Sequence, residues 1–402
     1  MSGIEHRPYL VSWNLTRRCN LACPHCYIDA QTETDGELTS GEVRSVIDEL
    51  ASLNNRLMLI LSGGEPMLRG DIFDIVAYAA KSGLITVMGS NGTLLSGERL
   101  KLLKEAGLKG IGISIDATVP GKHDSLRGGA DAWRRSVQAL DEAKGMGTET
   151  QLDVSLTDKN SGELDDFIEL GVKMGVKAVN FFFLVCTGRA MRSDISTGNY
   201  ERSLQRIAEV SSRERRTMVR ARCAPHINRV LYENGSPPPR GTRGCLAGIH
   251  YLRIDPQGQV TPCPYMPISV GNLRERSITE IWENAPFLKL LRSGQYNGRC
   301  GVCEYREICG GCRARAGTES GDCLGEDPLC SYIPREGETL SLRDDLHLYL
   351  PWDEKAQERI GKIPIFMKGM VIRMIEAKAR EQGAAIVTSE LIDGLKTQHY
   401  HG

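Results

Sequence analysis

The sequence contains no uninterrupted run of 18 apolar residues, the length that a helix needs to cross a bilayer. Its N-terminus does not show a positively charged stretch followed by an apolar segment, so a secretory signal peptide is not predicted. Opposite charges nearly cancel, leaving a formal net charge of −1. This balance gives no electrostatic reason to expect nucleic acid or an anionic membrane as a partner. We therefore expect a cytoplasmic protein.

What the sequence has in excess is cysteine. The 402 residues include 13 cysteines, and 41% of residues are hydrophobic, enough for a substantial core. Because a reducing cytosol disfavours disulfides, this many cysteines indicates metal or redox chemistry. Three cysteines lie between positions 19 and 26 and eight between 245 and 330, while Cys186 and Cys223 lie apart.

The first half of the chain alternates β-rich runs with amphipathic helical stretches. The predicted strands are 9–14, 57–62, 84–90, 110–116, 149–155 and 178–184, and the predicted helices are 40–52, 72–81, 97–105, 132–144, 163–174 and 200–213. Six successive βα units predict parallel strands with right-handed crossovers. Periodicity alone leaves open a full barrel, a partial barrel or an open sheet.

In the rest of the chain the composition and the hydrophobic pattern change twice. A Pro/Gly-rich stretch at 234–244 is typical of a linker, and 245–335 is rich in turns and cysteine, so we expect bound metal to hold it together. Helical patterns return at 353–360, 365–380 and 389–396. The predicted domains are 1–233, 234–335 and 336–402.

The first cysteine group has the spacing Cys19-x3-Cys23-x2-Cys26 and follows the first predicted strand. Three thiolates on a short loop can bind three irons of a [4Fe–4S] cluster and leave the fourth iron free of protein ligands. A zinc knuckle is the simpler alternative. It would need a fourth ligand, and His25 lies too close to the neighbouring cysteines to supply one.

This motif resembles the signature of the radical S-adenosylmethionine (SAM) superfamily, and the resemblance covers about residues 8–215. It implies an α/β fold with a partial (β/α)6, TIM-like barrel. It also implies an enzyme in which SAM chelates the open iron, so that Cys19, Cys23 and Cys26 are both metal ligands and catalytic residues. A one-electron donor such as flavodoxin or ferredoxin would drive cleavage of SAM to a 5′-deoxyadenosyl radical. His25 stands where the family has an aromatic residue beside the adenine.

Further motifs agree in order with the superfamily. The segment Ser62-Gly63-Gly64-Glu65-Pro66 ends the second predicted strand. Its glycines would let a ligand approach bare backbone, and its carboxylate can accept hydrogen bonds from an ammonium group. In the family this segment binds the methionyl amine of SAM.

Polar residues end the next two strands, where ligands of α/β proteins bind. Asn91, and Ser114 with Asp116, resemble the segments near the SAM ribose and the substrate, although Asn91 and Asp116 could equally be turn-capping residues. Arg127, within His123-Asp124-x2-Arg127-Gly128, resembles the arginine that pairs with the SAM carboxylate.

The second cysteine group resembles the SPASM extension of radical SAM enzymes, which carries one or two auxiliary [4Fe–4S] clusters. Two zinc ribbons are the alternative. The resemblance assigns Cys245, Cys263 and Cys312 to the first cluster and Cys300, Cys303, Cys309 and Cys330 to the second. The first then lacks a fourth cysteine. Cys223 or Cys323 could serve, or one iron could stay open to the substrate, while Cys186 is most simply a packing or site-lining residue.

Two parts of the sequence narrow the range of possible substrates. The stretch 181–189 and the region from Cys309 to Cys330 resemble the SPASM branch of haem d1 biosynthesis and the alternative haem pathway. The C-terminal part resembles the small module of the light-independent protochlorophyllide reductase B subunit. In it Phe366, Met370, Met374 and Ala377 form one apolar stripe, which predicts either a helical cap or dimer contact or a lid over a macrocycle.

We therefore expect an iron-tetrapyrrole substrate whose propionate chains are altered, by oxidative decarboxylation or side-chain loss, with the surplus electron leaving through an auxiliary cluster. Arg189 and Arg192 are candidate propionate partners. The principal alternative is a SPASM maturase that modifies a ribosomal peptide. Those enzymes usually carry an N-terminal peptide-binding domain, for which the first predicted strand leaves no space. A non-catalytic iron–sulfur electron carrier is a third possibility, but it would need no SAM pocket.

Overall fold

The computed structural model describes residues 6–54, 56–190, 195–238, 242–335, 339–340, 350–361, 363 and 365–400. For 361, 365–370, 373, 377 and 395–400 it describes the backbone alone. Within the described residues no helix is both long and apolar enough to span a membrane.

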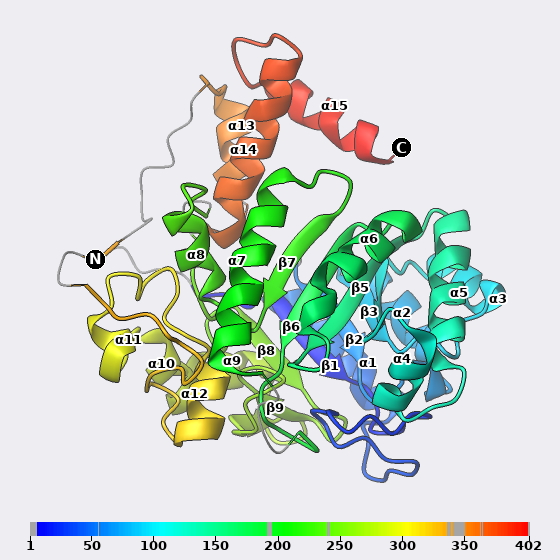
Figure 1. Cartoon of the computed structure of the whole chain (residues 1–402). Helices are drawn as coiled ribbons and strands as arrows, with labels where there is room; N and C mark the ends of the chain where they lie inside the picture. The colour runs from blue at the N-terminus through cyan, green and yellow to red at the C-terminus, as the bar shows by residue number, and fades with distance from the viewer. Residues whose placement is uncertain are drawn as a thin grey trace.

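One ten-stranded sheet organises the molecule, with the strand order β10-β9-β8-β1-β2-β3-β4-β5-β6-β7 (Figure 1). Neighbouring strands from β1 to β7 pair in parallel, and β8 also pairs in parallel with β1. Strand β9 pairs antiparallel with both β8 and β10. Because β7 and β10 end the order, the described sheet forms a partial barrel rather than a closed one. The strands are β1 Leu10–Asn14, β2 Met58–Ser62, β3 Ile85–Ser90, β4 Gly110–Ser114, β5 Glu149–Leu156, β6 Ala178–Phe183, β7 Met218–Arg222, β8 Tyr251–Ile254, β9 Gln259–Thr261 and β10 Gly271–Asn272.

Helices connect the parallel strands. These are α1 Ser40–Leu53, α2 Ile72–Lys81, α3 Gly97–Glu105, α4 Pro120–Arg127, α5 Ala132–Gly145, α6 Leu164–Met174 and α7 Thr197–Arg213, with single 3-10 turns at Pro66–Leu68 and Ser161–Glu163. The first helix begins where the sequence predicts, because Thr39 and Glu42 form a reciprocal capping box. All six predicted strands and the six predicted helices of this half are confirmed.

Side chains alternate between the two faces of the sheet, as the pleat requires. On β1, Val11 and Trp13 belong to the large hydrophobic core that the helices cover. Ser12 and Asn14 lie on the opposite face, which we call the inner face of the barrel. The partial barrel therefore has an apolar outer layer and a polar interior.

Several elements were not predicted. Helix α4 lies where the sequence indicated only a motif-bearing loop, and strands β7 to β10 carry too few apolar residues to show a clear period. Strand β8 pairs in parallel with β1 along its whole length, from Leu10 opposite Tyr251 to Trp13 opposite Ile254. The cysteine-rich region thus contributes strands to the same sheet as the first half of the chain.

The cysteine-rich region surrounds short helices. They are α8 Ile227–Glu233, α9 Ile278–Asn284, α10 Pro286–Arg292, α11 Gly298–Val302 and α12 Arg313–Ser320. Cysteine side chains form much of two small clusters in the described part of this region, in place of a large aliphatic core. This agrees with a fold that depends on bound metal.

The C-terminal helices α13 Glu354–Gly361, α14 Ile365–Glu381 and α15 Ser389–Tyr400 form a separate group with its own small core (Figure 1). On α14 the buried face carries Ile372, Ile375 and Ala379, whereas Met374 is 48% exposed. The predicted stripe is therefore not the face that packs within the module. The side chains of its other members, Phe366, Met370 and Ala377, lie outside the described residues.

Candidate active site

The three-cysteine loop leaves the carboxyl end of β1 and is held mainly by backbone contacts. The Cys19 amide donates to the Gln31 carbonyl (2.9 Å), and the Ala22 amide donates to the Arg127 carbonyl (3.2 Å). Two further amides face thiols, since Leu21 N lies 3.5 Å from the Cys19 sulfur and Ala30 N lies 3.3 Å from the Cys26 sulfur. Amides directed at thiolate sulfurs are typical of iron–sulfur sites.

Arg189, one of the predicted propionate partners, also supports this loop. Its Nε donates to the Cys23 carbonyl (3.0 Å) and its Nη1 to the Ala30 carbonyl (2.7 Å). Its Nη2 is buried without a hydrogen-bond partner, so a contact between Arg189 and a propionate stays a prediction. The other candidate, Arg192, lies outside the described residues.

The two glycines of Ser62-Gly63-Gly64-Glu65-Pro66 face backbone rather than open space. A Cβ on Gly63 would lie 2.5 Å from the Thr16 carbonyl oxygen, and one on Gly64 would overlap the carbonyl of Arg18. The Gly64 and Glu65 amides donate to the carbonyls of Thr16 and Arg18, both at 2.8 Å. These glycines bring two backbone segments together just before Cys19, and their role in letting a ligand approach stays a prediction.

This close approach gives a direct prediction. We expect Gly64→Ala to displace the cysteine loop, because the new methyl group would meet backbone that cannot rotate away. The cost should be about 2–4 kcal/mol, seen as a fall in melting temperature and as incomplete reconstitution of the loop's iron. Gly70→Ala is the matched control, since nothing lies within 4 Å of a Cβ at that position. Equal behaviour of the two variants would contradict this account.

Glu65 is fully buried within a network from the next strand. It accepts hydrogen bonds from Ser90 Oγ (2.9 Å), from the Asn91 amide (2.9 Å) and from the Met67 amide (3.1 Å). Burial outweighs these hydrogen bonds and raises the pKa of Glu65 to about 7. Asn91 in turn donates to Asn20 Oδ1 (2.9 Å), so the ends of β2 and β3 are tied to the cysteine loop.

A second buried group joins β4 to the same loop. Asp116 Oδ2 lies 2.9 Å from His25 Nε2 and 2.8 Å from Arg127 Nε, although neither contact has the angles of a hydrogen bond. Burial disfavours the charged carboxylate, but Arg127 and His25 outweigh it and lower the pKa of Asp116. Asp116 also accepts from the Ser155 amide (2.7 Å), while Ser114 ends β4 nearby on the inner face.

The predicted SAM-site residues therefore converge on one end of the barrel, around the cysteine loop. Sequence reasoning missed Tyr27, whose hydroxyl accepts from Asn14 Nδ2 (2.7 Å) and whose ring contacts that of Tyr265. It also missed Gly188, where a Cβ would lie 2.5 Å from the carbonyl carbon of Tyr27. The sequence feature that could have indicated a role for Tyr27 in the site is its position directly after Cys26.

Five cysteines gather at the first auxiliary site. Cys263, Cys312 and Cys323 are buried in one small cluster, and Cys223 and Cys245 pack against it. Burial raises the pKa of Cys263, and the neighbouring thiols of Cys245, Cys312 and Cys223 raise it further. The structure thus brings Cys223, at the end of β7, to the three cysteines that the sequence pattern assigned.

The two candidates for the fourth ligand differ in their surroundings. Cys223 has φ 56°, a left-handed conformation that a non-glycine residue adopts only when its surroundings impose it. Its carbonyl is held by Arg315 Nη2 at 2.9 Å. Cys323 instead directs its sulfur at Gly317 on α12 and shares electrostatic contact with Cys245 alone among the other four.

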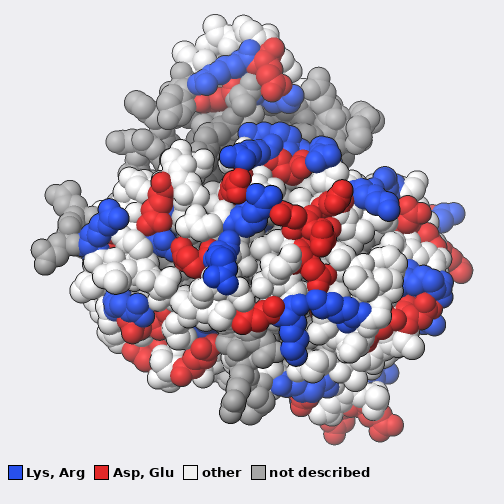
Figure 2. Space-filling model, in the orientation of Figure 1, with Lys and Arg blue, Asp and Glu red and all other residues white. Residues whose placement is uncertain are grey.

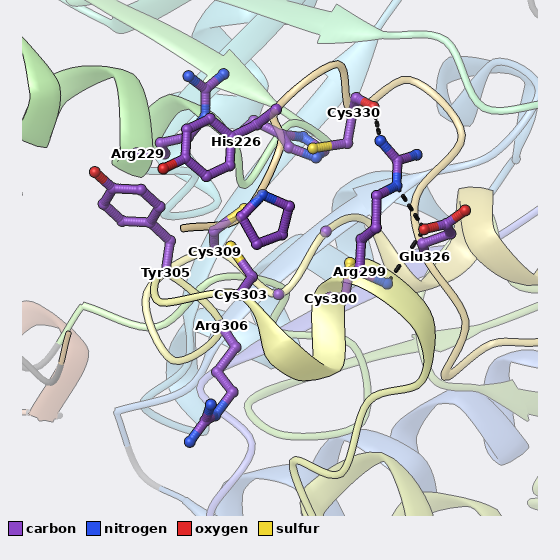
Figure 3. A pocket seen from close by; sticks show the side chains of 14 residues that line it. His226, Arg229, Arg299, Cys300, Cys303, Tyr305, Arg306, Cys309, Glu326 and Cys330 are labelled. Carbon is purple, nitrogen blue, oxygen red and sulfur yellow. Dashed lines mark hydrogen bonds and ion pairs between the residues drawn. The ribbon is translucent and has the colours of Figure 1, made fainter. Parts of the chain in front are cut away.

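The second auxiliary site is a pocket lined by four thiols. Cys300, Cys303, Cys309 and Cys330 surround it together with His226, and Figure 3 shows their side chains around a common cavity. The pKa of Cys309 is raised by burial and then by the other three cysteines, which confirms their mutual proximity. This is the set that the sequence pattern assigned to the second cluster.

A buried ion pair lies between the two auxiliary sites. Arg315 and Asp327 are both fully buried, with Nη1 and Oδ2 2.8 Å apart. Asp327 also accepts from the Cys312 amide (2.7 Å), and His226 Nε2 lies 3.9 Å from it. Through Cys312 on one side and His226 on the other, this pair contacts both thiol groups.

Among the described residues, no three Cys, His, Asp or Glu side chains are grouped as ligands of a single metal ion. Single-ion zinc sites hold their sulfurs about 3.8 Å apart, the edge of a tetrahedron with ~2.3 Å Zn–S bonds. A cubane spans a wider set of thiolates. The pocket lined by Cys300, Cys303, Cys309 and Cys330 fits a cluster in the number and kind of its ligands.

Comparison with known proteins gives the same assignment. Residues 13–171 match the Radical SAM superfamily, residues 245–313 an iron–sulfur cluster-binding domain named SPASM, and residues 352–396 the proto-chlorophyllide reductase 57 kD subunit. The AdoMet-dependent heme synthase of Methanosarcina barkeri (strain Fusaro) is 38% identical over 348 residues, covering 83% of this chain and 99% of that protein. The pre-heme d1 synthase of Dinoroseobacter shibae is 29% identical, covering 84% and 89%.

A solved structure shares the fold. Streptococcus suis SuiB bound to S-adenosylmethionine superposes with a TM-score of 0.66 at 15% identity, covering 81% of this chain and 78% of that one. The chain belongs to the radical SAM superfamily and is an enzyme. Within the superfamily it carries the SPASM iron–sulfur domain, and its sequence groups with the heme synthases and pre-heme d1 synthase.

The cofactors of this family are a [4Fe–4S] cluster with SAM and auxiliary iron–sulfur clusters, and together the first two supply a 5′-deoxyadenosyl radical. The residues present fit them: Cys19, Cys23 and Cys26 share one loop, and the auxiliary cysteines gather in two groups. The chain's own contribution is to position these thiols and to place the polar ends of β2, β3 and β4 beside them.

Proposed function

We propose that this enzyme converts propionate side chains of an iron porphyrin to vinyl groups by oxidative decarboxylation. The observation that carries the proposal is the similarity to the AdoMet-dependent heme synthase, which extends over 99% of that protein and so includes both cysteine regions. The iron-porphyrin substrate and a one-electron donor of the flavodoxin or ferredoxin type follow from this proposal.

The chemistry balances for each propionate. Transfer of a hydrogen atom from the propionate carbon next to the ring to the adenosyl radical leaves a carbon radical. Loss of carbon dioxide and of one electron to a one-electron acceptor then gives the vinyl group. No protein acid or base is required for these steps, so the chain's task is to hold the propionate beside the SAM site and to exclude water.

We also propose which residues hold the cofactors. Cys223 completes the first auxiliary set, and Glu65 and Arg127 face the SAM amine and carboxylate, with His25 near the adenine. The supporting geometry is that Glu65 and Arg127 both lie beside the cysteine loop, through Asn91 and Cys23 respectively.

The test is anaerobic reconstitution with iron, sulfide, SAM and dithionite, followed by addition of iron coproporphyrin III, which bears four propionates. We expect 5′-deoxyadenosine to form together with a porphyrin that has lost carboxyl groups, detected by mass and by a shift of the visible bands. A wild-type enzyme that cleaves SAM but neither binds nor alters the porphyrin would contradict the proposal. A peptide substrate, the alternative, would then take its place.

A further inference from the structure

The inner face of the barrel carries a polar row across three neighbouring strands. Asp153 on β5 lies opposite Asn180 on β6, which lies opposite Arg220 on β7. Arg222, two residues further along β7, therefore projects to the same side as Arg220. The alternate residues of β7 face the other way: Val219 is buried in the outer core and Ala221 packs against it.

Asn180 fixes the geometry of this row. Its Nδ2 donates to Asp153 Oδ1 and to Gln151 Oε1, both at 2.8 Å, while its Oδ1 accepts from Arg222 Nε at 3.2 Å. On the other side of Asp153, β4 places Ser114 opposite it, and a Cβ on Gly112 would overlap the carboxylate. The row is therefore held by defined contacts and leaves the outer ends of the arginines available.

Within the described part of the chain, the two arginines of β7 act electrostatically on Asp153 but form no ion pair with a carboxylate. The contact made by the Arg220 guanidinium is to Met218 Sδ (2.8 Å). Burial, and then the charge of Arg222, lower the pKa of Arg220 to about 10, although Asp153 acts in the opposite direction. On the outer surface, by contrast, cations and carboxylates are interspersed (Figure 2), and Arg213 and Arg216 pair with Glu209 and Glu214.

Two half-buried guanidinium groups side by side repel each other and lose hydration, so the arrangement favours an anion. The planar guanidinium donates two parallel hydrogen bonds to a carboxylate, which makes this pair suited to one or two carboxylates. The inner face that carries this row extends toward the predicted SAM site. The charge of Asp153 is influenced by Arg222 and by Arg127, which itself contacts Asp116 and Cys23.

A third cation faces this row from the other side of the barrel. Arg253 on β8 lies opposite Ser12, and its Nε donates to Asn14 Oδ1 (2.6 Å). Asn14 also donates to the Tyr27 hydroxyl, one residue beyond Cys26. Since β8 and β7 flank the six strands β1 to β6, cations project inward from both sides.

We infer that Arg220 and Arg222 form the carboxylate-binding site of the substrate, holding propionates that are not being altered so that another lies beside the SAM site. This inference rests on the proposed function and deepens it, because it adds two guanidinium groups of β7 to the predicted propionate partner Arg189. It assigns to β7 a role in selecting porphyrins by the number of their carboxylates.

The experiment measures porphyrin binding by Soret-band titration of the anaerobically reconstituted protein. We expect Arg220→Gln/Arg222→Gln to bind iron coproporphyrin III at least about 100-fold more weakly, near tenfold for each charged hydrogen-bonding group lost. Affinity for the tetramethyl ester of the same porphyrin should be unchanged by the substitutions. Arg222→Lys should recover part of the loss, because it keeps the charge without the paired geometry.

The charge-matched control is Arg213→Gln/Arg216→Gln, which removes two exposed cations outside the barrel and should leave both affinities unchanged. SAM cleavage without porphyrin should persist in every variant. If the wild type bound iron coproporphyrin and the β7 double variant bound it equally tightly, this inference would be overturned and the proposed function would stand. If the wild type bound no porphyrin, the proposed function would fail and the inference with it.

Discussion

Cys23→Ala should abolish the formation of 5′-deoxyadenosine from SAM. The variant would retain two thiolates on the loop, too few to hold a cubane with one open iron. Cys23 is also the best enclosed of the three, since it is 9% exposed, its carbonyl accepts from Arg189 and its sulfur lies 4.0 Å from Arg127 Nη1. We expect the reconstituted protein to lose about four irons per chain and to give no product above background after reduction with dithionite.

Cys186→Ala is the control for this experiment. Cys186 is separated in sequence from the three cysteine groups, and its sulfur lies 3.6 Å from Glu319 Oε1. Its removal should leave the iron content and the yield of 5′-deoxyadenosine as in the wild type. SAM cleavage at the normal rate by the Cys23 variant would remove the basis for a radical mechanism in this chain.

The second large effect concerns the first auxiliary site, where Cys223 and Cys323 should differ. We expect Cys223→Ala to lose or destabilise one auxiliary cluster, because its sulfur belongs to the set with Cys245, Cys263 and Cys312. Cys323→Ala should keep the cluster, since that sulfur packs against Gly317. The measurement is iron content with electron paramagnetic resonance of the reduced protein.

Both substitutions are best made in the Cys23→Ala background, so that the remaining signal comes from the auxiliary clusters alone. Each is a cysteine-to-alanine change in the same region, which makes one the control for the other. The reverse result, with the signal lost only on removal of Cys323, would move the fourth ligand to α12. An unchanged signal in both would leave the first cluster with three cysteine ligands.

Much of the barrel was predictable because its strands have apolar residues on the helix-covered face and its helices begin with capping residues such as Thr39. Strand β7 was not, because Arg220 and Arg222 leave only Val219 and Ala221 to indicate a core face. Strands β8 to β10 contain two to four residues each, too few to establish a period. The long-range pairing of β8 with β1 defines this part of the sheet instead, and β9 and β10 follow by antiparallel pairing.

The site was predictable where ligands are close in sequence, as in the cysteine loop and the four-cysteine group around the second pocket. It was not where side chains from distant elements meet. Arg189 carries the same guanidinium as Arg222, and only the fold shows that the first is engaged by the Cys23 and Ala30 carbonyls. Likewise, Cys223 and Cys323 are equivalent candidates in the sequence, and only the fold shows that Cys223, directly after β7, packs against Cys263 and Cys312.

The parallel ladder between β1 and β8 has a consequence for how the molecule assembles. A nascent chain that ends before residue 251 would present the edge of β1 unpaired, next to the loop that carries Cys19. We therefore expect the two halves to depend on each other for folding, with cluster insertion accompanying docking of the C-terminal half. Expression of the N-terminal half alone should yield an aggregating fragment rather than a smaller radical enzyme.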